Sequence, residues 1–340
     1  MAFTVFLTGV TGYIGGNAFD YIYQEHKGKG YRWLLLVRDE ECGKKVKEVY
    51  PDVEFVYGTI QDSEVLEKAA AEADVVIDTA DSADCVAAAT AIAKGLKAGH
   101  GPERSAWWIH LSGTGILTYG DVKKGREGEA PLPEDEYFDV DGIDRLVNLP
   151  LDAWHKDVDQ IAQDANSDSV FVAIICPCTI YDVGRGPVKR HSQQVPDMIR
   201  ATLNEGYVPV IGNGLTEWDN VNVHDLGDLY LRLFNAIQNP ELSKNPEVFG
   251  INGYFFARNG EHKWSDVAKQ ISEVTKRPIK SITMADNAKL KNGNITWGSN
   301  SKGVPQRAKK YLGWEAKGCP LSDTIAEACK VEADRLGLTL

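Results

Sequence analysis

Short runs of apolar residues alternate with helix-compatible segments along the first half of the chain. The runs contain few polar residues, which is the pattern of strands buried on both faces of a parallel sheet. Strands that alternate with helices at this spacing indicate an α/β fold with a doubly wound parallel sheet. The predicted strands are 3–7, 33–37, 55–56, 74–77, 107–111 and 170–176, and the predicted helices between them are 17–25, 65–73, 85–96 and 151–165.

The second half of the chain carries weaker patterns. Residues 119–150 are charged and contain Pro and Gly, which indicates a surface excursion without a domain of its own. Because 340 residues exceed the size of most single cores, we expect two parts. The larger sheet domain would comprise 1–178 and return at 216–250, and a smaller C-terminal part would comprise mainly 179–215 and 251–340. Further helices are predicted around 195–203, at the end of 219–237, and over 264–276 and 320–336.

Composition narrows the classes of partner and location. The net charge is −12 at pH 7, which argues against nucleic acid and anionic membranes, since both attract basic surfaces. No apolar run reaches the length of a membrane span, and the first strand begins too early for a cleaved signal peptide, so we expect a cytoplasmic protein. The six cysteines are scattered, and the close pair Cys176 and Cys178 has poor zinc spacing. We therefore expect reduced thiols and no metal site.

The first predicted strand runs into a glycine-rich turn, FTVFLTGVTGYIGG at residues 3–16. Gly9 would permit a tight turn, Gly12 would let the backbone approach a diphosphate, and Gly15 would let the next helix pack closely on the sheet. The N-terminus of that helix offers free amides and the positive end of a dipole to phosphate groups. The sequence therefore predicts a nucleotide cofactor, held by Thr8, Gly9, Thr11, Gly12, Tyr13, Ile14 and Gly15.

The spacing GxxGxxG after Thr8 resembles the short-chain dehydrogenase/reductase superfamily, and TGVTGYIG resembles its extended branch of sugar-nucleotide epimerases, dehydratases and ketone reductases. Later segments resemble that branch in the same order: CPCTIYDVGRG at 176–186, GNG at 212–214 with VNVHDL at 221–226, and AKKYLGW before a closing helix. The resemblance implies a Rossmann cofactor-binding domain with a smaller C-terminal substrate lobe. It also adds Ile60, Asp62, Ala80 and Pro177 to the expected cofactor contacts.

The residues after the second strand, Arg38 and Asp39, bear on the type of cofactor. An acid there accepts hydrogen bonds from the ribose hydroxyls and repels a 2′-phosphate, whereas an arginine attracts that phosphate. Arg38 comes first, where NADP-dependent reductases of the resembled branch carry theirs, so NADP(H) is favoured. Asp39 keeps NAD(H) as an alternative. Asp62 would lie near the adenine ring, or would cap the helix that follows it.

The resembled superfamily carries its reaction centre as a Ser or Thr together with a Tyr and a Lys spaced YxxxK. There the lysine lowers the pKa of the tyrosine, which exchanges a proton with the carbonyl oxygen while the nicotinamide moves hydride. The end of the fifth predicted strand supplies Ser112 and Thr114 in this chain. We therefore expect these two residues at the reaction centre, although Ser112 would also suit a backbone contact at the strand end.

The helix predicted over 151–165 lacks the YxxxK pair. Aligning His155 with the lysine puts Leu151 at the tyrosine, and a shift by one residue to Lys156 puts Asp152 there. Three hypotheses stay open. The chain is a reductase with a different acid, best supplied by His155 beside Lys156; a regulator similar to the fungal nitrogen-repression type; or a protein that binds cofactor for structure only. His155 could instead position the cofactor, and a loop tyrosine could supply the acid, from Tyr119, Tyr137 or Tyr181.

Polar and aromatic residues gather in the segments that would form the substrate lobe. The expected substrate contacts are Tyr181, Arg185, Gln194 and Trp218. A nucleotide-sugar would need arginines such as Arg185, Arg190 and Arg200 for its diphosphate, whereas Trp218 and Trp297 suit an aromatic or terpenoid substrate. Asp225 is expected to cap a nearby helix.

Together these patterns favour an NADP(H)-dependent oxidoreductase that acts on a carbonyl or related unsaturated bond of a small molecule, with an aromatic compound as one option. The proton donor would not be the usual tyrosine. The alternatives are a non-catalytic NAD(P)-sensing regulator and a nucleotide-sugar epimerase or dehydratase. The resemblance also implies a possible homodimer, formed by the helices predicted over 151–165 and 85–97.

Overall fold

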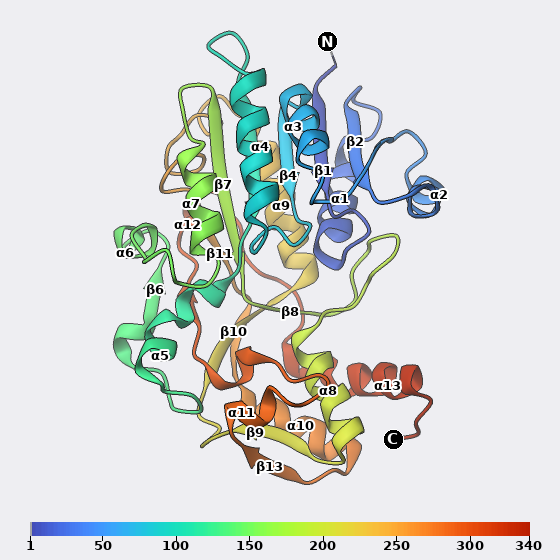
Figure 1. Ribbon diagram of the computed structural model, residues 1–340, viewed down its shortest axis with the longest axis vertical. Coiled ribbons are helices and arrows are strands. Elements are labelled where there is room, and N and C mark those ends of the chain that lie inside the picture. Colours follow the sequence, from blue (N-terminus) through green and yellow to red (C-terminus); the bar gives the residue numbers. More distant parts are fainter. Residues whose placement is uncertain (1) are drawn as a thin grey trace.

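A seven-stranded parallel sheet forms the larger part of the computed structural model, which describes residues 2–340 (Figure 1). The strand order is β11-β7-β5-β4-β1-β2-β3, so the direction of winding reverses between β1 and β4. This confirms the predicted doubly wound α/β fold. The strands are β1 Thr4–Thr8, β2 Arg32–Val37, β3 Glu54–Tyr57, β4 Val75–Asp78, β5 Ala106–Leu111, β7 Val170–Pro177 and β11 Tyr254–Ala257.

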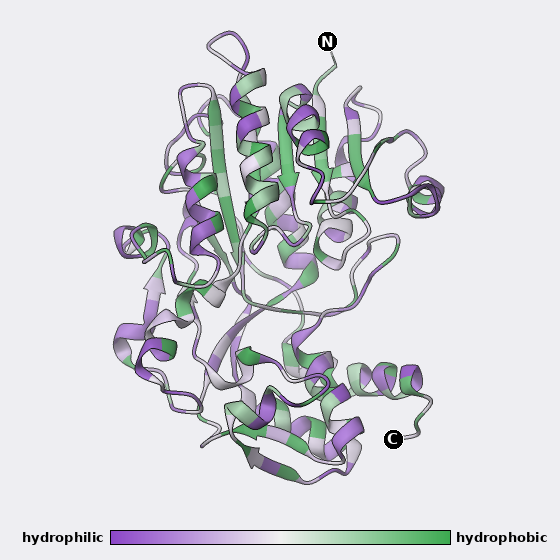
Figure 2. Ribbon diagram, in the orientation of Figure 1, coloured by the Kyte–Doolittle hydropathy of each residue, from purple (hydrophilic) through white to green (hydrophobic). Residues whose placement is uncertain are grey.

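Helices cover both faces of this sheet, because successive strand residues point to opposite sides. Val5 and Leu7 of β1 pack into one core, and Phe6 between them packs into the other. The central strands are therefore hydrophobic along most of their length, whereas the helices carry their polar residues outward (Figure 2). The edge strand β3 differs, because Glu54 and Tyr57 at its two ends are exposed. One core is closed by α1 Tyr13–His26, α2 Glu40–Val49, α9 Val223–Ile237 and α12 Arg307–Leu312, and the other by α3 Ser63–Glu72, α4 Val86–Gly99 and α7 Lys156–Asp164.

The helix predicted over 151–165 begins later than expected, at Lys156. Residues 151–155 form turns, in which the amide of Ala153 donates to the carbonyl of Pro150. His155 has a φ of 69°, which is left-handed and incompatible with a helix that continues through it. The side chain of His155 is therefore placed by a turn and not by helical periodicity.

A second, smaller part lies below the large sheet in Figure 1 and has its own core. Its main sheet has the order β12-β10-β8, and β9 pairs with β13 in a second sheet. The range 251–340 contributes to both parts, because β11 is an edge strand of the large sheet. The elements are β8 Thr179–Tyr181, α8 Gln194–Glu205, β9 Val208–Ile211, β10 Glu217–Asn222, β12 Gly260–Lys263, α10 Trp264–Thr275, β13 Ile279–Ile282, α11 Met284–Asn287, η3 Ile295–Gly298, η4 Leu321–Thr324 and α13 Ile325–Leu336.

The excursion predicted over 119–150 is tied to the C-terminal half of the chain. Its strand β6 pairs in parallel with β14, which lies far away in the sequence. Asp139 accepts hydrogen bonds from the amides of Phe256, Gln306 and Arg307. The elements here are η1 Thr114–Thr118, α5 Tyr119–Lys124, η2 Pro133–Asp135, β6 Glu136–Phe138, α6 Ile143–Val147 and β14 Lys302–Val304. Among residues 2–340, no helix combines the length and apolarity required to cross a membrane.

Candidate cofactor-binding and catalytic site

The glycine turn joins β1 to α1 with no room for side chains. Gly9 has a φ of 86°, and a Cβ there would lie 2.6 Å from Thr79 Oγ1. A Cβ at Gly15 would overlap both Thr79 Oγ1 and the Gly9 carbonyl. The turn thus holds the start of α1 directly against the ends of β1 and β4.

The N-terminus of α1 offers unpaired donors at this turn. Gly12 is the N-cap residue and has no side chain to satisfy the first amides. The amides of Tyr13, Ile14 and Gly15 have no acceptor among residues 2–340. Free amides at the positive end of a helix dipole suit a phosphate group, so the residues present fit the diphosphate of a dinucleotide.

The side chain of Thr8 joins β1 to β4. Its Oγ1 donates to Asp78 Oδ1 at 2.7 Å and accepts from the amides of Thr79 and Ala80 at 3.1 and 3.2 Å. The expected cofactor contacts Thr8 and Ala80 are therefore occupied with each other. The Thr8 hydroxyl and the Ala80 amide are thus not free for a ligand.

The carboxyl end of β2 leaves one charged side chain available. Arg38 is exposed, and its guanidinium forms no hydrogen bond or ion pair within residues 2–340. Asp39 caps α2 by accepting the amide of Cys42 at 2.8 Å. This backbone hydrogen bond lowers the pKa of Asp39. Of the two residues, Arg38 is the one with a free side chain.

At the end of β3, the carboxylate of Asp62 closes a turn. It accepts from the amide of Thr59 at 2.6 Å and from the Thr59 hydroxyl at 2.9 Å. Asp62 is the N-cap residue of α3, as the predicted alternative has it, but its side chain makes no capping hydrogen bond to the helix. Ile60, inside this turn, is partly buried beside Cys85.

The end of β5 brings together His155, Asp84 and the turn around Gly113. The Nδ1 atom of His155 lies 2.8 Å from Asp84 Oδ1. A Cβ built on Gly113 would lie 3.3 Å from His155 Nε2, so Nε2 lies at the backbone that leaves β5. This nitrogen has no partner within residues 2–340 and is not enclosed. It is therefore left without a protein partner at the edge of the sheet.

Ser112 and Thr114 lie beside His155 but are buried. The Ser112 hydroxyl donates to Asp159 Oδ2 at 3.0 Å. Thr114 Oγ1 has no partner among the described residues, and the Thr114 carbonyl accepts from Ser301 Oγ at 2.7 Å. Pro177 ends β7, the strand next to β5.

Lys156 is not at this edge of the sheet. Its ammonium is buried in the core, where it donates to Gln163 and lies 6.0 Å from the ring centre of Tyr254. Burial lowers the pKa of Lys156. The expectation that Lys156 takes part in catalysis does not agree with this position, because the first turn of α7 directs the side chain into the protein.

A buried charge cluster supports the ends of β4 and β5. His110 lies between Asp78 and Asp159, with nitrogen–oxygen distances of 3.5 Å to each. Burial alone would lower the pKa of His110, but the two carboxylates raise it to about 9. Through Asp78 and Asp159 this histidine is linked to Thr8 and to Ser112.

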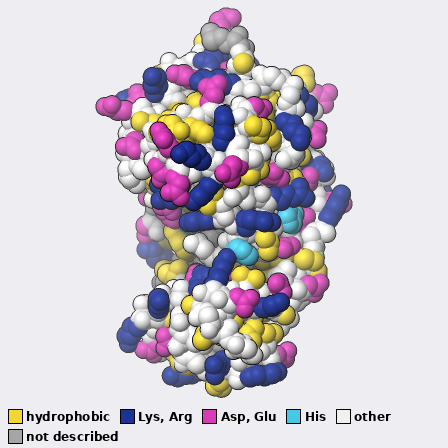
Figure 3. Space-filling view, turned by 90° about the vertical axis from the view of Figure 1, so that its right-hand side faces the viewer, with side chains coloured by type: hydrophobic (Ala, Val, Ile, Leu, Met, Phe, Trp, Pro, Cys, Tyr) yellow, Lys and Arg dark blue, Asp and Glu magenta, His cyan; other side chains and the backbone are white. Residues whose placement is uncertain are grey.

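The loop 182–190 lies over the glycine turn. The Tyr13 hydroxyl donates to the carbonyl of Asp182 at 2.7 Å, and the amide of Lys189 donates to the carbonyl of Thr11 at 3.1 Å. Arg185 stacks on the ring of Tyr21 at 4.4 Å. Lys, Arg and His side chains gather at this level of the molecule, between its two parts (Figure 3). The loop 182–190 was predicted to belong to the substrate lobe alone. It is basic and also borders the glycine turn.

The other expected substrate contacts lie mainly in the smaller part, and of these Tyr181 also reaches the glycine turn, where its carbonyl accepts from the Tyr13 hydroxyl at 3.0 Å. The Trp218 indole is buried and donates to the carbonyl of Ser299 at 2.6 Å, and Trp297 is buried too. The Tyr181 hydroxyl donates to the carbonyl of Cys319 at 2.6 Å. Gln194 begins α8 and is partly buried. The two tryptophans therefore belong to the core of the smaller part and provide no aromatic surface for a ligand.

Two further expectations fail on the contacts that the residues make. Arg200 is paired with Asp197 and Glu332 at 2.6 and 2.8 Å, so it is not free for a diphosphate. Asp225 does not cap the helix, because Asn222 does. Asp225 accepts the amides of residues 317 and 318 instead.

The three loop tyrosines that were considered as alternative proton donors are engaged elsewhere through their rings or hydroxyl groups. Tyr137 is buried beneath the guanidinium of Arg145, 3.7 Å from its ring centre. Burial raises the pKa of Tyr119, and a hydrogen bond between its hydroxyl and Asp152 raises this pKa further. Burial raises the pKa of Tyr181 above its usual value.

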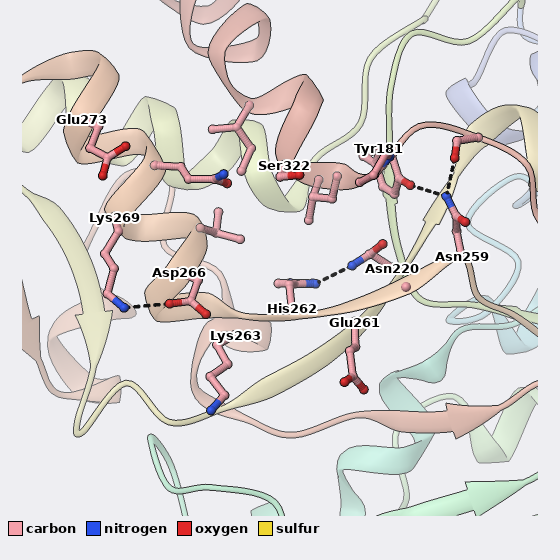
Figure 4. A pocket seen from close by; sticks show the side chains of 17 residues that line it. Tyr181, Asn220, Asn259, Glu261, His262, Lys263, Asp266, Lys269, Glu273 and Ser322 are labelled. Atoms are coloured by element: carbon pink, nitrogen blue, oxygen red, sulfur yellow. Dashed lines mark hydrogen bonds and ion pairs between the residues drawn. The ribbon is translucent and has the colours of Figure 1, made fainter.

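A pocket of about 560 Å³ opens in the smaller part, away from the glycine turn (Figure 4). It is lined by β12, α10 and η4, and His262 points toward Asn220 in it, with 3.2 Å between their nitrogens. Burial lowers the pKa of His262 to about 3, so its imidazole is neutral. Some of the charges that line it are paired, as in Lys269 with Asp266 at 2.7 Å. Tyr181 also lines this pocket and is the one lining residue among the four expected substrate contacts, and Asn220 belongs to the polar residues expected in the substrate lobe.

Asp84 was also missed, as was Trp154, which shares the Asp84 carboxylate. Asp84 lies 71 residues from His155, so no local pattern joins them. Asp159 follows His155 by one helical turn and aligns with the acid of the resembled helices, but the alignment alone assigned it no role at the site.

Comparison with known proteins agrees with this geometry. The model of the NAD dependent epimerase/dehydratase family matches residues 5–98, which contain the glycine turn and the ends of β2 to β4. The oxidase ucsJ of Acremonium sp is 33% identical over 98% of this chain and 99% of its own length. The protein YLL056C of Saccharomyces cerevisiae is 25% identical over 94% of this chain and 97% of its own.

Solved structures share the fold at low identity. The dTDP-glucose 4,6-dehydratase of Bacillus anthracis, in complex with NAD, is 17% identical with a TM-score of 0.63 over 98% of this chain and 97% of that one. The UDP-glucose 4-epimerase of Thermotoga maritima, with UDP-glucose, is 16% identical with a TM-score of 0.62 over 98% and 99%. With a family model over its N-terminal strands and a full-length relative at 33% identity, the chain belongs to the NAD-dependent epimerase/dehydratase family and is an extended short-chain dehydrogenase/reductase.

Proposed function

We propose that the protein is an NADP(H)-dependent oxidoreductase that reduces a carbonyl or related unsaturated bond of a small molecule, with His155 as the proton donor. The observation that carries the proposal is the free Nε2 atom of His155 at the end of β5. This atom shares the carboxyl edge of the sheet with the unpaired amides of α1 and with Arg38. Ligands of doubly wound sheets gather at that edge.

The residues that would hold the cofactor are the turn and the end of β2. The amides of Tyr13 and Ile14 would bind the diphosphate, and Arg38 would pair with a 2′-phosphate. Asp39, the residue that would favour NAD(H), is engaged in capping α2. The cited dehydratase contains NAD, so NAD(H) is the alternative that a binding measurement must separate.

His155 would deliver the proton. A bound nicotinamide supplies hydride to the carbonyl carbon of the substrate. The Nε2 proton of the imidazolium passes to the carbonyl oxygen, which gives an alcohol and a neutral imidazole that solvent reprotonates. The Asp84 carboxylate holds Nδ1 and stabilises the charged ring before transfer. No step requires the tyrosine that the chain lacks.

The proposal also covers the partners, the location and the oligomeric state of the protein. The substrate is a small molecule taken up at the edge between the two parts, and neither nucleic acid nor a membrane is a partner in this proposal. All six cysteines are unpaired, which supports the expected cytoplasmic location. The expected homodimer would use α4 and α7, which lie side by side on one face of the sheet.

Calorimetric titration with NADPH, NADP⁺, NADH and NAD⁺ tests the proposal. We expect NADPH to bind most tightly, and Arg38→Ala to weaken NADPH binding by about tenfold or more while NADH binding changes little. Arg277→Ala, at an exposed arginine between α10 and β13, is the matched control. Equal losses for both reduced cofactors would remove the 2′-phosphate assignment, and no binding of any of the four would remove the function.

One observation favours a second candidate, a cofactor-sensing regulator without turnover. The Ser112 hydroxyl donates to Asp159, so its proton is not available to polarise a substrate carbonyl. A regulator would bind oxidised and reduced cofactor with similar affinity and would reduce no carbonyl compound. The same four titrations distinguish it from the reductase.

A further inference from the structure

Hydrogen bonds hold the loop 182–190 against the first turn of α1. The backbone amide of Lys189 donates to the carbonyl of Thr11 at 3.1 Å, and the Tyr13 hydroxyl donates to the carbonyl of Asp182 at 2.7 Å. These contacts use a carbonyl and a side chain of the turn, and they leave its unpaired amides free. The loop therefore borders the expected phosphate site without pairing with the amides that would bind the phosphate.

The loop is also closed on itself and fixed at its start. The amide of Gly184 donates to the carbonyl of Arg190 at 2.8 Å, and Nε of Arg190 donates back to the Gly184 carbonyl at 2.6 Å. Asp182 has a φ of 78°, which is left-handed and uncommon for a residue other than glycine. Its carboxylate accepts from Nδ2 of Asn222 at 2.9 Å. These contacts keep the backbone of Lys189, which lies between the two ends of the loop, in one place beside the turn.

Lys189 differs from the arginines of the loop in having no partner. The Arg185 guanidinium stacks on the ring of Tyr21 at 4.4 Å, and that of Arg190 is bonded to the loop backbone. The side chain of Lys189 is exposed, and its ammonium forms no hydrogen bond, ion pair or ring contact within the part of the chain that the structure describes. Because a lysine carries its charge on a flexible four-carbon stem, this ammonium can reach past the carbonyl that its own amide binds.

We propose that Lys189 is a further cofactor-binding residue, whose ammonium pairs with the diphosphate of NADP(H). This inference rests on the proposed function, which places that diphosphate on the amides of Tyr13 and Ile14. Thr11, the partner of the Lys189 amide, directly precedes Gly12, the N-cap residue of α1. A diphosphate on these amides therefore lies within reach of the ammonium, which forms charge-assisted hydrogen bonds to its oxygens.

The two unpaired cations around the turn then bind different phosphates. Arg38 lies at the end of β2, where doubly wound sheets bind the ribose of the adenosine. Lys189 lies at the turn that holds the diphosphate. Lys189 contributes equally to the binding of NADPH and NADH, whereas Arg38 contributes to the binding of NADPH alone. Because the Lys189 pair is exposed to solvent, added salt screens it.

Two fragments of the cofactor test this assignment by calorimetric titration. ADP-ribose carries the diphosphate without a 2′-phosphate, and 2′-AMP carries the 2′-phosphate without a diphosphate. We expect Lys189→Ala to weaken the binding of ADP-ribose, NADH and NADPH by about fivefold each, and that of 2′-AMP by less than about twofold. Arg38→Ala should weaken the binding of 2′-AMP and NADPH and leave that of ADP-ribose within about twofold.

Every Lys189 variant tested keeps the backbone amide that docks the loop, so a loss of affinity reports the ammonium. Lys189→Arg keeps the charge and should retain most of the affinity for ADP-ribose, whereas Lys189→Gln should lose as much as Lys189→Ala. Added KCl should weaken ADP-ribose binding more steeply in the wild type than in Lys189→Ala. Lys291→Ala, at an exposed lysine between α11 and η3, is the matched control and should change nothing.

The outcomes are distinct. Unchanged ADP-ribose affinity in Lys189→Ala, equal losses for ADP-ribose and 2′-AMP, or the same salt dependence in wild type and variant would overturn the assignment of Lys189 and leave the proposed function standing. Absence of binding of every dinucleotide to the wild type would overturn the proposed function, and the inference with it. Thermal melting of each variant by circular dichroism establishes that the compared proteins are folded.

Discussion

At the scale of residues, His110 shows how a charge is kept inside the sheet. The side chain is fully buried between Asp78 and Asp159, and both carboxylates are also bound to hydroxyl groups at the carboxyl edge. Removing one member of such a cluster would leave a buried charge without compensation. The cluster therefore fixes Thr8 and Ser112 in place as long as the histidine carries its proton.

This arrangement predicts a defined pH dependence of stability. The pKa of His110 is raised to about 9, so its contribution is complete below about pH 6.5 and is lost as the pH rises through about 9. The shift corresponds to about 3 kcal/mol of unfolding free energy. In urea unfolding between pH 6 and pH 10, the stability lost in His110→Gln relative to wild type should be largest at pH 6 and should shrink toward pH 10.

His262→Gln is the matched control for that series. Burial lowers the pKa of His262 to about 3, so this histidine is neutral throughout the range and its substitution should cost a pH-independent amount. A constant difference between wild type and His110→Gln from pH 6 to pH 10 would contradict a protonated His110.

At the scale of elements, the packing of α1 on the sheet depends on the glycine turn. Gly15→Ala places a methyl group where Thr79 Oγ1 and the Gly9 carbonyl already lie. We expect α1 to shift outward, with a loss of about 1–3 kcal/mol in stability and of about tenfold or more in NADPH affinity. Gly101→Ala is the control, because a Cβ there meets nothing within 4 Å. Unchanged NADPH affinity in Gly15→Ala would separate the turn from cofactor binding.

The elements also show what the sequence could predict. Strands buried on both faces leave long apolar runs, so the positions of β1, β2, β4, β5 and β7 follow from pattern alone. The turn before α7 does not, because the left-handed conformation of His155 and its contact with Asp84 depend on residues 71 positions apart. For the same reason Trp218 and Trp297 were expected in a substrate site, whereas their indole N–H groups are bonded to backbone carbonyls in a core.

At the scale of the whole molecule, α9 connects the large sheet to the C-terminal tail. Asp225 accepts the amides of Lys317 and Gly318 at 2.8 and 2.9 Å, and its own carbonyl accepts from the Trp314 indole at 3.0 Å. The tail then passes to η4 and α13 of the smaller part. A single buried carboxylate therefore helps to fix the two parts relative to each other.

Asp225→Ala should weaken this connection. Two charge-assisted hydrogen bonds are lost and two amides remain unpaired, so we expect a loss of about 3 kcal/mol in unfolding free energy. Asp228→Ala, one turn away and paired with Arg232 at 2.7 Å on the surface, should cost less than about 1 kcal/mol. Equal losses in urea unfolding would show that Asp225 does not hold the tail.

The loop over the glycine turn has a consequence for how the protein is made. The turn is complete within the first 16 residues, but the groups that lie over it, from the Asp182 carbonyl to the Lys189 amide, are translated much later. A nascent chain that ends before residue 182 exposes the turn without its cover. Comparing the retention of such a fragment and of the full chain on an immobilised nucleotide would therefore measure what the covering loop contributes to binding.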